Sequence, residues 1–187
     1  MSYFLLLRPL SWVKNFLVFA PLFFSGNLFL PDKLMPTINA FILFCLASSS
    51  AYIINDLADK KHDLIHPLKR NRPIASGKIT TAGALLLLLP LLLALSFIIV
   101  PSWPQLAWVI VLYLLLNLRY SFYLKNFALF DICLLSVFYL LRITSGGIAA
   151  AIALSPWLVL CTIFLSLFLA TAKRKAEADG LYSTNAD

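Results

Sequence analysis

The stretch from Pro36 to Arg72, PTINAFILFCLASSSAYIINDLADKKHDLIHPLKRNR, decides how this chain folds. Its first part, Pro36–Ile54, is apolar and close to the length of about 20 residues that a membrane-spanning helix needs. Its second part, Asn55–Arg72, holds acidic and basic side chains at short intervals. The change from one to the other predicts a membrane helix that carries a polar site to one surface of the bilayer.

Three aspartates in the polar part, Asp56, Asp59 and Asp63, lie three and four positions apart, with Asn55 beside them. This spacing places the side chains on one face of a helix. Like charges on one face repel each other, so the pattern favours a cation bound among them. Because hard carboxylate oxygens suit Mg²⁺, we expect the three aspartates to be ligands of this metal.

Basic residues follow the aspartates at Lys69, Arg70 and Arg72. Ammonium and guanidinium groups bind phosphate oxygens through charge-assisted hydrogen bonds. We therefore expect these three residues to bind an anion, such as a diphosphate, that the metal carries. Charge-rich loops between spans are ordinary, but such a loop would not usually place every carboxylate on one helical stripe.

The rest of the chain has the composition of an integral membrane protein. Of its 187 residues, 61% are hydrophobic and only 12% are charged, about half the charged fraction of soluble domains. Apolar segments recur throughout, which predicts one all-α domain over residues 1–187, a polytopic transmembrane bundle of about six spanning helices. The predicted spans are Val13–Leu30, Pro36–Ile54, Ile79–Val100, Trp103–Leu118, Asn126–Ile148 and Leu154–Ala172.

The basic residues fall on one predicted side of the membrane. Of the fifteen Lys and Arg residues, all except Lys33 and Arg142 lie on that side. Because positively charged loops stay in the cytoplasm, both termini and the aspartate-rich loop are predicted to be cytoplasmic. This topology also explains the net charge of +7, so nucleic acid is not expected as a partner.

A second candidate site follows the fourth predicted span. Asp131 lies about one and a half turns inside the next apolar span, where a carboxylate is costly and usually functional. The alternative is a structural ion pair with a nearby Lys or Arg. Arg142 lies on nearly the same helical face, about 16 Å farther along the axis. It either snorkels outward or closes a polar path, and with Asn55 it is a further candidate for substrate binding.

Further candidates for substrate binding stand at the same predicted membrane surface. Each of them either contacts substrate or only anchors a helix end under the positive-inside rule, and the sequence leaves both interpretations open. These candidates are Lys14, Tyr120, Lys125, Lys173 and Arg174.

The chain resembles the UbiA-type intramembrane polyprenyl transferases. The family pattern N-D-x-x-D-x-x-x-D is complete in Asn55, Asp56, Asp59 and Asp63, and HPLKRNRPIASGKI follows it as in the family. The opening RPLSWVKNFLVFAPLFFSG, the YSFYLK segment and KRKAE are similar to the branch that transfers phosphoribosyl groups to decaprenyl phosphate. The resemblance covers nearly the whole chain.

The resemblance implies a helical bundle in the bacterial inner membrane, around a cavity open to the cytoplasm and to lipid. The three aspartates of the pattern would hold Mg²⁺ and a diphosphate, while Asp131 would belong to a second acidic motif. Arg72 and Lys125 would neutralise phosphate oxygens. Leu135 stands where the second motif often has another acid. Family members also usually have more spanning helices, so we expect a C-terminally incomplete chain, or one that assembles with a second copy or a complementing chain.

The reaction that the resemblance favours is Mg²⁺-dependent transfer of 5-phosphoribosyl from phosphoribosyl pyrophosphate to a polyprenyl phosphate. One alternative is transfer of a polyprenyl group from its diphosphate to an aromatic acceptor, for which the same metal site would serve. Another is a non-catalytic membrane protein or an inactive remnant. The identity of the donor separates the first two, and a folded protein that binds no substrate would favour the third.

Overall fold

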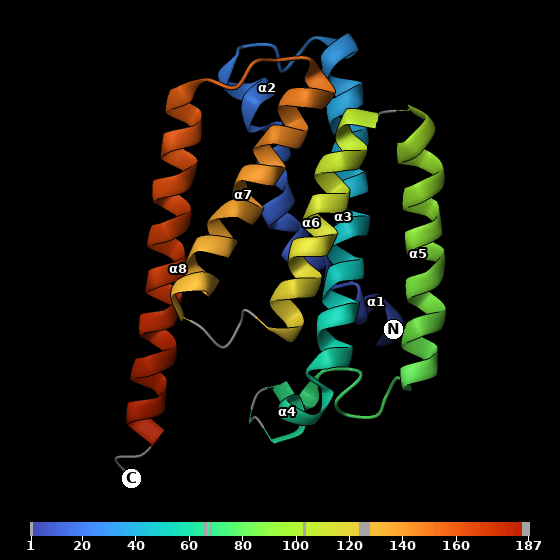
Figure 1. Cartoon of the computed structure of the whole chain (residues 1–187), viewed down its shortest axis with the longest axis vertical. Coiled ribbons are helices and arrows are strands. Elements are labelled where there is room, and N and C mark those ends of the chain that lie inside the picture. The colour runs from blue at the N-terminus through green and yellow to red at the C-terminus, as the bar shows by residue number, and fades with distance from the viewer. Residues whose placement is uncertain (1, 66, 68, 103, 124–127, 185–187) are drawn as a thin grey trace.

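The computed structural model describes residues 2–65, 67, 69–102, 104–123 and 128–184, and this part of the chain consists of helices and the turns that join them, without a strand (Figure 1). The predicted all-α class is confirmed. In chain order the elements are α1 (Ser2–Leu6), the 3-10 helix η1 (Pro9–Phe19), α2 (Ala20–Phe24), α3 (Pro31–Ala58), α4 (Lys60–Ile65), the 3-10 turn η2 (Lys69–Asn71), α5 (Thr81–Ser102), α6 (Pro104–Phe122), α7 (Ala128–Ala150) and α8 (Pro156–Thr184).

Four helices of the described chain, α3, α6, α7 and α8, are long and apolar enough to cross a membrane. Two further apolar segments, α5 and the η1–α2 segment, belong to the same bundle. Each predicted span from Pro36 onward corresponds to one helix of the structure, α3, α5, α6, α7 or α8. However, α3 already begins at Pro31 and α8 continues to Thr184, both beyond the predicted limits.

The first predicted span, Val13–Leu30, takes a different form from the expected membrane helix. Most of it is the 3-10 helix η1, only α2 is α-helical, and α3 begins at Pro31. Pro21 explains where η1 ends, because it has no N–H to donate to the carbonyl of Val18, three residues back, so the bond from Ala20 to Leu17 is the last of the 3-10 pattern. A 3-10 helix rises about 2.0 Å per residue, so η1 and α2 together advance about 30 Å, the thickness of the hydrocarbon core.

The 3-10 geometry presents one row of η1 side chains to the bundle, because a 3-10 helix has three residues per turn. Trp12, Asn15 and Val18 lie in this row, and Nε1 of Trp12 donates to Oγ of Ser49 at 3.0 Å. The carbonyl of Val18 lies against Gly146 of α7, where a β-carbon would be 1.8 Å from the oxygen. The absence of a side chain at Gly146 therefore lets η1 pack directly on α7.

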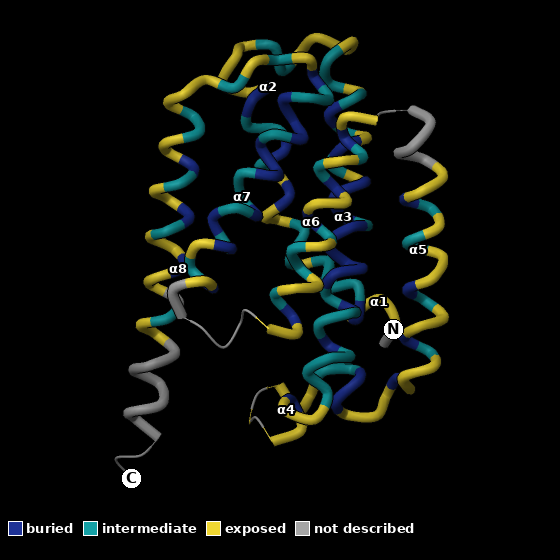
Figure 2. The backbone as a smooth tube through the Cα atoms, in the orientation of Figure 1, coloured by how far each residue is buried: buried dark blue, intermediate teal, exposed yellow. Residues whose placement is uncertain are grey.

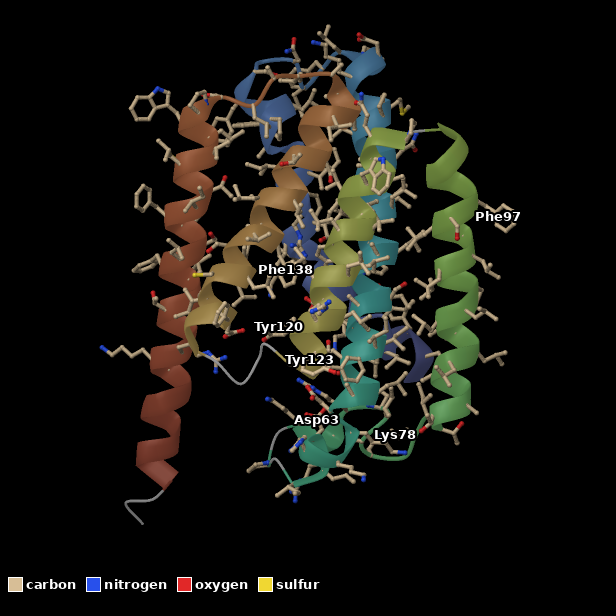
Figure 3. All side chains as sticks on the ribbon, viewed as in Figure 1. Asp63, Lys78, Phe97, Tyr120, Tyr123 and Phe138 are labelled. Carbon is tan, nitrogen blue, oxygen red and sulfur yellow. The ribbon has the colours of Figure 1, made fainter. Side chains whose placement is uncertain are left out.

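The helices at the two sides of the bundle turn apolar faces outward. Figure 2 shows burial concentrated on the inner helices, while much of α5 and α8 is exposed. Phe97 of α5 points away from the bundle (Figure 3), and aromatic residues of α8 such as Phe164 and Phe168 are exposed. Contiguous apolar surface of this kind fits contact with lipid.

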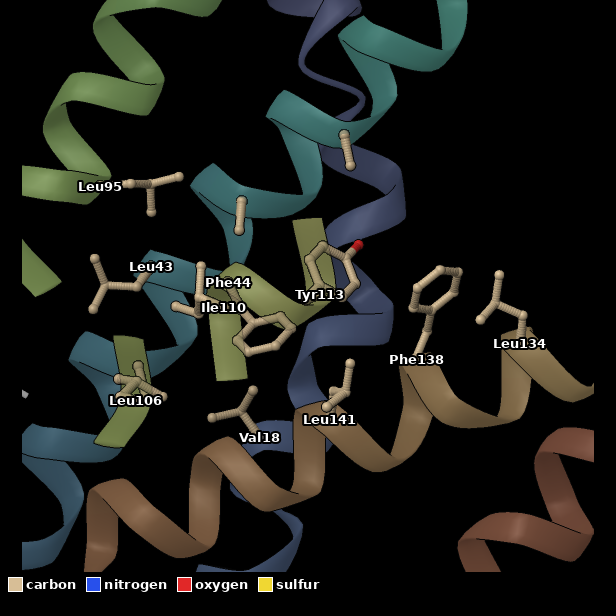
Figure 4. Close-up of a cluster of buried hydrophobic side chains, with 13 residues drawn as sticks. Val18, Leu43, Phe44, Leu95, Leu106, Ile110, Tyr113, Leu134, Phe138 and Leu141 are labelled. Carbon is tan, nitrogen blue, oxygen red and sulfur yellow. The ribbon is translucent and has the colours of Figure 1, made fainter. Parts of the chain in front are cut away.

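The core lies around α3, which packs on α5, α6, α7 and η1. Three aromatic rings from three helices meet there: Phe44 of α3, Tyr113 of α6 and Phe138 of α7 (Figure 4). The ring centroids are 5.2 Å apart for Phe44 and Tyr113, and 5.3 Å apart for Tyr113 and Phe138. Tilted pairs at these distances are favourable and fix the three helices against one another.

A second core cluster lies at the end of the bundle that carries α4 and η2, here called the charged end. Leu6 of α1, Ile53 of α3, and Ile74 and Ile79 of the loop before α5 are buried together there. This cluster holds the loop close to the end of α3. The polar residues of both segments are thereby brought together.

Candidate active site at the charged end

Asp56, in the last turn of α3, is the most enclosed of the predicted metal ligands. Its side chain is 2% exposed, and Oδ1 accepts from Nη2 of Arg8 at 2.5 Å and from Nη1 of Arg72 at 3.3 Å. The other oxygen, Oδ2, is buried without a hydrogen-bond partner. Because an unsatisfied buried carboxylate oxygen is costly, Oδ2 is an open position for a cation or a donor.

Asp63, on α4, shares one of these arginines. Its Oδ2 lies 2.7 Å from Nη1 of Arg72, and the aspartate is buried (Figure 3). A single guanidinium nitrogen thus bridges Asp56 and Asp63. The bridge ties α3, α4 and the loop after η2 to one point.

Asp59 lies at a break in the helix, since α3 ends at Ala58 and α4 begins at Lys60. The backbone N–H of Asp59 still donates to the carbonyl of Asn55 at 2.9 Å, and that of Asp63 donates to the carbonyl of Asp59 at 2.8 Å. These bonds between residues four apart keep Asp59 in helical register with its neighbours. The sequence predicted the helical register but not the break.

Asn55 links the aspartates to α6. Its Nδ2 donates to Oδ2 of Asp59 at 3.2 Å, and its Oδ1 accepts from Oγ of Ser121 at 3.1 Å. Ser121 is buried at this contact and was not predicted from the sequence. A single serine next to Tyr120 carries no pattern that distinguishes it from a packing residue.

Arg8, rather than Lys14, is the N-terminal cation that meets the aspartates. Arg8 has φ 53° and ψ 59°, in the left-handed region that side chains rarely adopt, at the bend between α1 and η1. Its guanidinium lies 5.0 Å from the ring centroid of Tyr52, which adds a cation–π contact to the ion pair with Asp56. Lys14 lies about 12 Å farther along η1, and its side chain is exposed.

Asp131, at the start of α7, is buried and paired. Arg174 of α8 binds its Oδ2 through Nε at 2.7 Å and through Nη2. Its Oδ1, like Oδ2 of Asp56, is buried without a hydrogen-bond partner. Tyr120 of α6, labelled in Figure 3, interacts electrostatically with Asp131 and with Asp59. Tyr120 therefore adjoins both acidic segments.

Arg142 points into the bundle and is 4% exposed, so the expectation that it might snorkel outward is wrong. Its Nε donates to Oδ1 of Asn15 at 2.9 Å, and its Nη1 donates to the carbonyl of Phe138 at 2.7 Å. Its guanidinium also lies 5.3 Å from the ring centroid of Tyr113. Among the described side chains it has no ion pair with a carboxylate. Arg142 thus forms a buried polar contact between α7 and η1.

The remaining predicted residues divide into two groups. Lys69 and Arg70 lie on η2 with exposed side chains, directly before Arg72 in the chain. Lys125 lies outside the described residues, as does the side chain of Lys173.

No group of three His, Cys, Asp or Glu residues within the described ranges is gathered closely enough to hold a metal ion. Arg72 lies between Asp56 and Asp63, and Asn55 occupies one oxygen of Asp59. The donor set nevertheless suits a hard cation, because it consists of carboxylate oxygens and one of them has no partner. The residues present therefore fit Mg²⁺ by the chemistry of their oxygens, although their spacing here is not that of a formed metal site.

Fold and site together define a polytopic helical membrane protein with two acidic segments at one end of its bundle. Residues 15–179 match the model of the UbiA prenyltransferase family, and the chain belongs to this family. It is 43% identical over 176 residues to the decaprenyl-phosphate phosphoribosyltransferase of Mycolicibacterium smegmatis. The matched region covers 91% of this chain and 55% of the relative.

Proteins with the same name from two other organisms give similar values. The identity is 40% over 176 residues for Corynebacterium glutamicum, covering 91% of this chain and 53% of the relative. For Mycobacterium tuberculosis it is 41% over 185 residues, covering 91% and 58%. The chain thus spans a little over half the length of these relatives.

Proposed function

We propose that this chain is the donor-binding part of a Mg²⁺-dependent integral membrane transferase, which moves 5-phosphoribosyl from phosphoribosyl pyrophosphate to a polyprenyl phosphate such as decaprenyl phosphate. The observation that carries the proposal is the arrangement around Asp56 and Asp63, where two buried carboxylates meet two arginines at the end of the bundle. The similarity to three decaprenyl-phosphate phosphoribosyltransferases supports this choice of donor and acceptor.

In this proposal each charged group has a role in binding the donor. Asp56, Asp59 and Asp63 hold Mg²⁺, which as a Lewis acid would stabilise the negative charge of the departing diphosphate. Arg8 and Arg72 supply charge-assisted hydrogen bonds to the diphosphate oxygens. Exposed Lys69 and Arg70 raise the local concentration of an anionic donor.

The transfer itself needs little acid–base chemistry. The bond between the anomeric carbon and the diphosphate oxygen breaks, and the electron pair leaves with the diphosphate. An oxygen of the lipid phosphate then bonds to the same carbon. Because this oxygen is already anionic, no general base has to remove a proton. Tyr120, which interacts with Asp131, would help to orient the sugar through its hydroxyl.

The charges of the loops support an active site that faces the cytoplasm of a bacterial inner membrane. Phosphoribosyl pyrophosphate is soluble, whereas the polyprenyl phosphate lies in the bilayer. A site at the charged end of an apolar bundle would be reached by both. The exposed apolar surface of α5 and α8 would lie in the lipid that holds the acceptor.

A second candidate reaction, transfer of a polyprenyl group to an aromatic acceptor, is favoured by the family model itself, whose name is UbiA prenyltransferase. The two candidates share the metal site and the diphosphate leaving group. They differ in the donor, which is soluble in one case and a membrane lipid in the other.

The test is calorimetric titration of the purified chain in detergent with phosphoribosyl pyrophosphate and Mg²⁺. Asp56→Asn should abolish the binding, and Asp32→Asn should not, since Asp32 is an exposed aspartate at the other end of the same helix. Binding of a polyprenyl diphosphate in place of phosphoribosyl pyrophosphate would favour the prenyl transfer. Equal binding by the wild type and Asp56→Asn would contradict the metal site in both candidates.

A further inference from the structure

Arg72 lies at the point between two carboxylates that a bridging cation would take. Its Nη1 is 3.3 Å from Oδ1 of Asp56 and 2.7 Å from Oδ2 of Asp63. The two aspartate side chains are 2% and 4% exposed, so little water screens them. Arg8 adds a second positive charge on Asp56, and the four groups together carry no net charge.

A divalent cation bound by Asp56 and Asp63 would bring two further positive charges to this point. Like charges within a few ångströms repel strongly where water is excluded. The cation and the guanidinium of Arg72 therefore compete for the same two carboxylates. This step rests on the proposed function, because it takes the three aspartates as ligands of Mg²⁺.

Of the two arginines, Arg72 is the one that contacts both carboxylates, so its departure would open the position between them. Arg8 stacks on Tyr52 and, among the carboxylates of the described residues, pairs with Asp56. By contrast, Arg72 follows the three-residue turn η2, whose side chains are all exposed. The buried residue Ile74 anchors the loop just beyond it, so the side chain can swing while the loop stays in place.

We propose that Arg72 is an exchangeable substitute for the metal, which closes the acidic site until the donor arrives. Without a ligand its guanidinium bridges Asp56 and Asp63. When a diphosphate enters with its divalent cation, the guanidinium leaves the carboxylates and binds the diphosphate oxygens. The exchange keeps the buried charges compensated at both stages, and it makes the site select metal–diphosphate over free metal.

The test measures Mn²⁺ binding to the detergent-solubilised chain by electron paramagnetic resonance, with and without inorganic pyrophosphate. Arg72→Gln should bind Mn²⁺ alone about tenfold more tightly than the wild type, and Mn²⁺–pyrophosphate about tenfold more weakly. Lys78→Gln removes the same charge from an exposed position of the same loop and should change neither affinity (Figure 3). A loss of both affinities in Arg72→Gln would overturn the exchange, because Arg72 would then only support the site.

Hydrogen exchange of the wild type gives a second measurement that does not depend on the folding of a variant. With Mn²⁺ alone, the amides of η2 and Arg72 should exchange faster, because Arg72 is released. With Mn²⁺ and pyrophosphate together they should exchange more slowly than without ligand, because Arg72 is captured. A change in the same direction in both cases would contradict the proposal.

These readouts separate the inference from the proposed function. If opposite effects appear with pyrophosphate but phosphoribosyl pyrophosphate does not bind, the exchange holds and the proposed donor is wrong. If phosphoribosyl pyrophosphate binds with Mg²⁺ and Arg72→Gln lowers both Mn²⁺ affinities, the donor holds and the exchange is wrong.

Discussion

Nε of Arg142 donates to Oδ1 of Asn15 at 2.9 Å, which joins the middle of α7 to the middle of η1. Asn15 in turn donates from Nδ2 to Oγ of Ser48 at 3.1 Å, so one amide connects three elements. Both Asn15 and Arg142 are buried, and in the described part of the chain no carboxylate compensates the arginine. The contact is therefore sensitive to the loss of either partner.

The first prediction concerns this pair. Asn15→Leu should lower the free energy of unfolding by about 2–3 kcal/mol, because a hydrogen bond to a buried charged group is lost and the guanidinium keeps no side-chain amide partner. Adding Arg142→Met should recover part of this loss, because the uncompensated charge is removed as well. Unfolding of the four members of the cycle in detergent measures the coupling. Additive effects would show that the two residues act independently.

The second prediction concerns Gly146. Gly146→Ala should destabilise the protein by about 3 kcal/mol, because the new β-carbon would overlap the carbonyl oxygen of Val18 and backbone cannot move aside easily. Gly83→Ala is the matched control, since its β-carbon would meet side-chain atoms rather than backbone, the hydroxyls of Tyr3 at 2.9 Å and Thr80 at 3.3 Å and a methyl group of Ile79 at 3.5 Å. Thermal unfolding of both variants tests the claim. Equal stability of the two variants would argue against the tight contact between η1 and α7.

A third prediction concerns the ion pair between α7 and α8. Arg174→Ala leaves Asp131 buried without its two-pronged partner, which should cost about 2–3 kcal/mol, less than a fully buried pair because Arg174 is partly exposed. Limited proteolysis should then cut the C-terminal part of α8 faster than in the wild type. Lys175→Ala, an exposed neighbour, should leave the cleavage rate unchanged. Faster cleavage in both variants would indicate a general weakening of α8 instead.

The backbone of Arg8 gives a fourth prediction. Arg8→Gly and Arg8→Ala both remove the ion pair with Asp56, but only alanine must still adopt a positive φ. Arg8→Gly should therefore be more stable than Arg8→Ala by about 1 kcal/mol. Both variants should lose affinity for the metal–diphosphate ligand to the same degree. If alanine proves the more stable replacement, the left-handed bend at this position is not what the chain adopts in the membrane.

The sequence was sufficient for most helices and for the acidic segments. Long apolar runs leave few alternatives to membrane helices, because every backbone polar group in lipid must bond within its own segment. The aspartates of 55–63 stand out because the chain has only eight acidic residues and three of them fall at helical spacing in this short segment. These features are local, and local patterns are what a sequence reveals.

The pairings of the site could not be read from the sequence because they are not local. Arg8 meets Asp56 across 48 positions, and Arg142 meets Asn15 across 127. In the sequence both arginines have simpler explanations, as a helix anchor and as a snorkelling residue. Nor does the sequence predict η1 as a 3-10 helix, because its packing on Gly146 of α7 joins segments more than 120 positions apart.

Every third residue of η1 contacts the bundle. The number of residues between these contacts is therefore fixed. Trp12, Asn15 and Val18 meet α3 and α7 in turn. Inserting one residue between them would rotate every later side chain by about 120° around the helix axis. Inserting three residues would bring these side chains back to the face that contacts the bundle. An analysis of helical periodicity tuned to the α-helix would therefore overlook this stripe. Insertions or deletions in this segment should therefore be tolerated only when they add or remove three residues at a time.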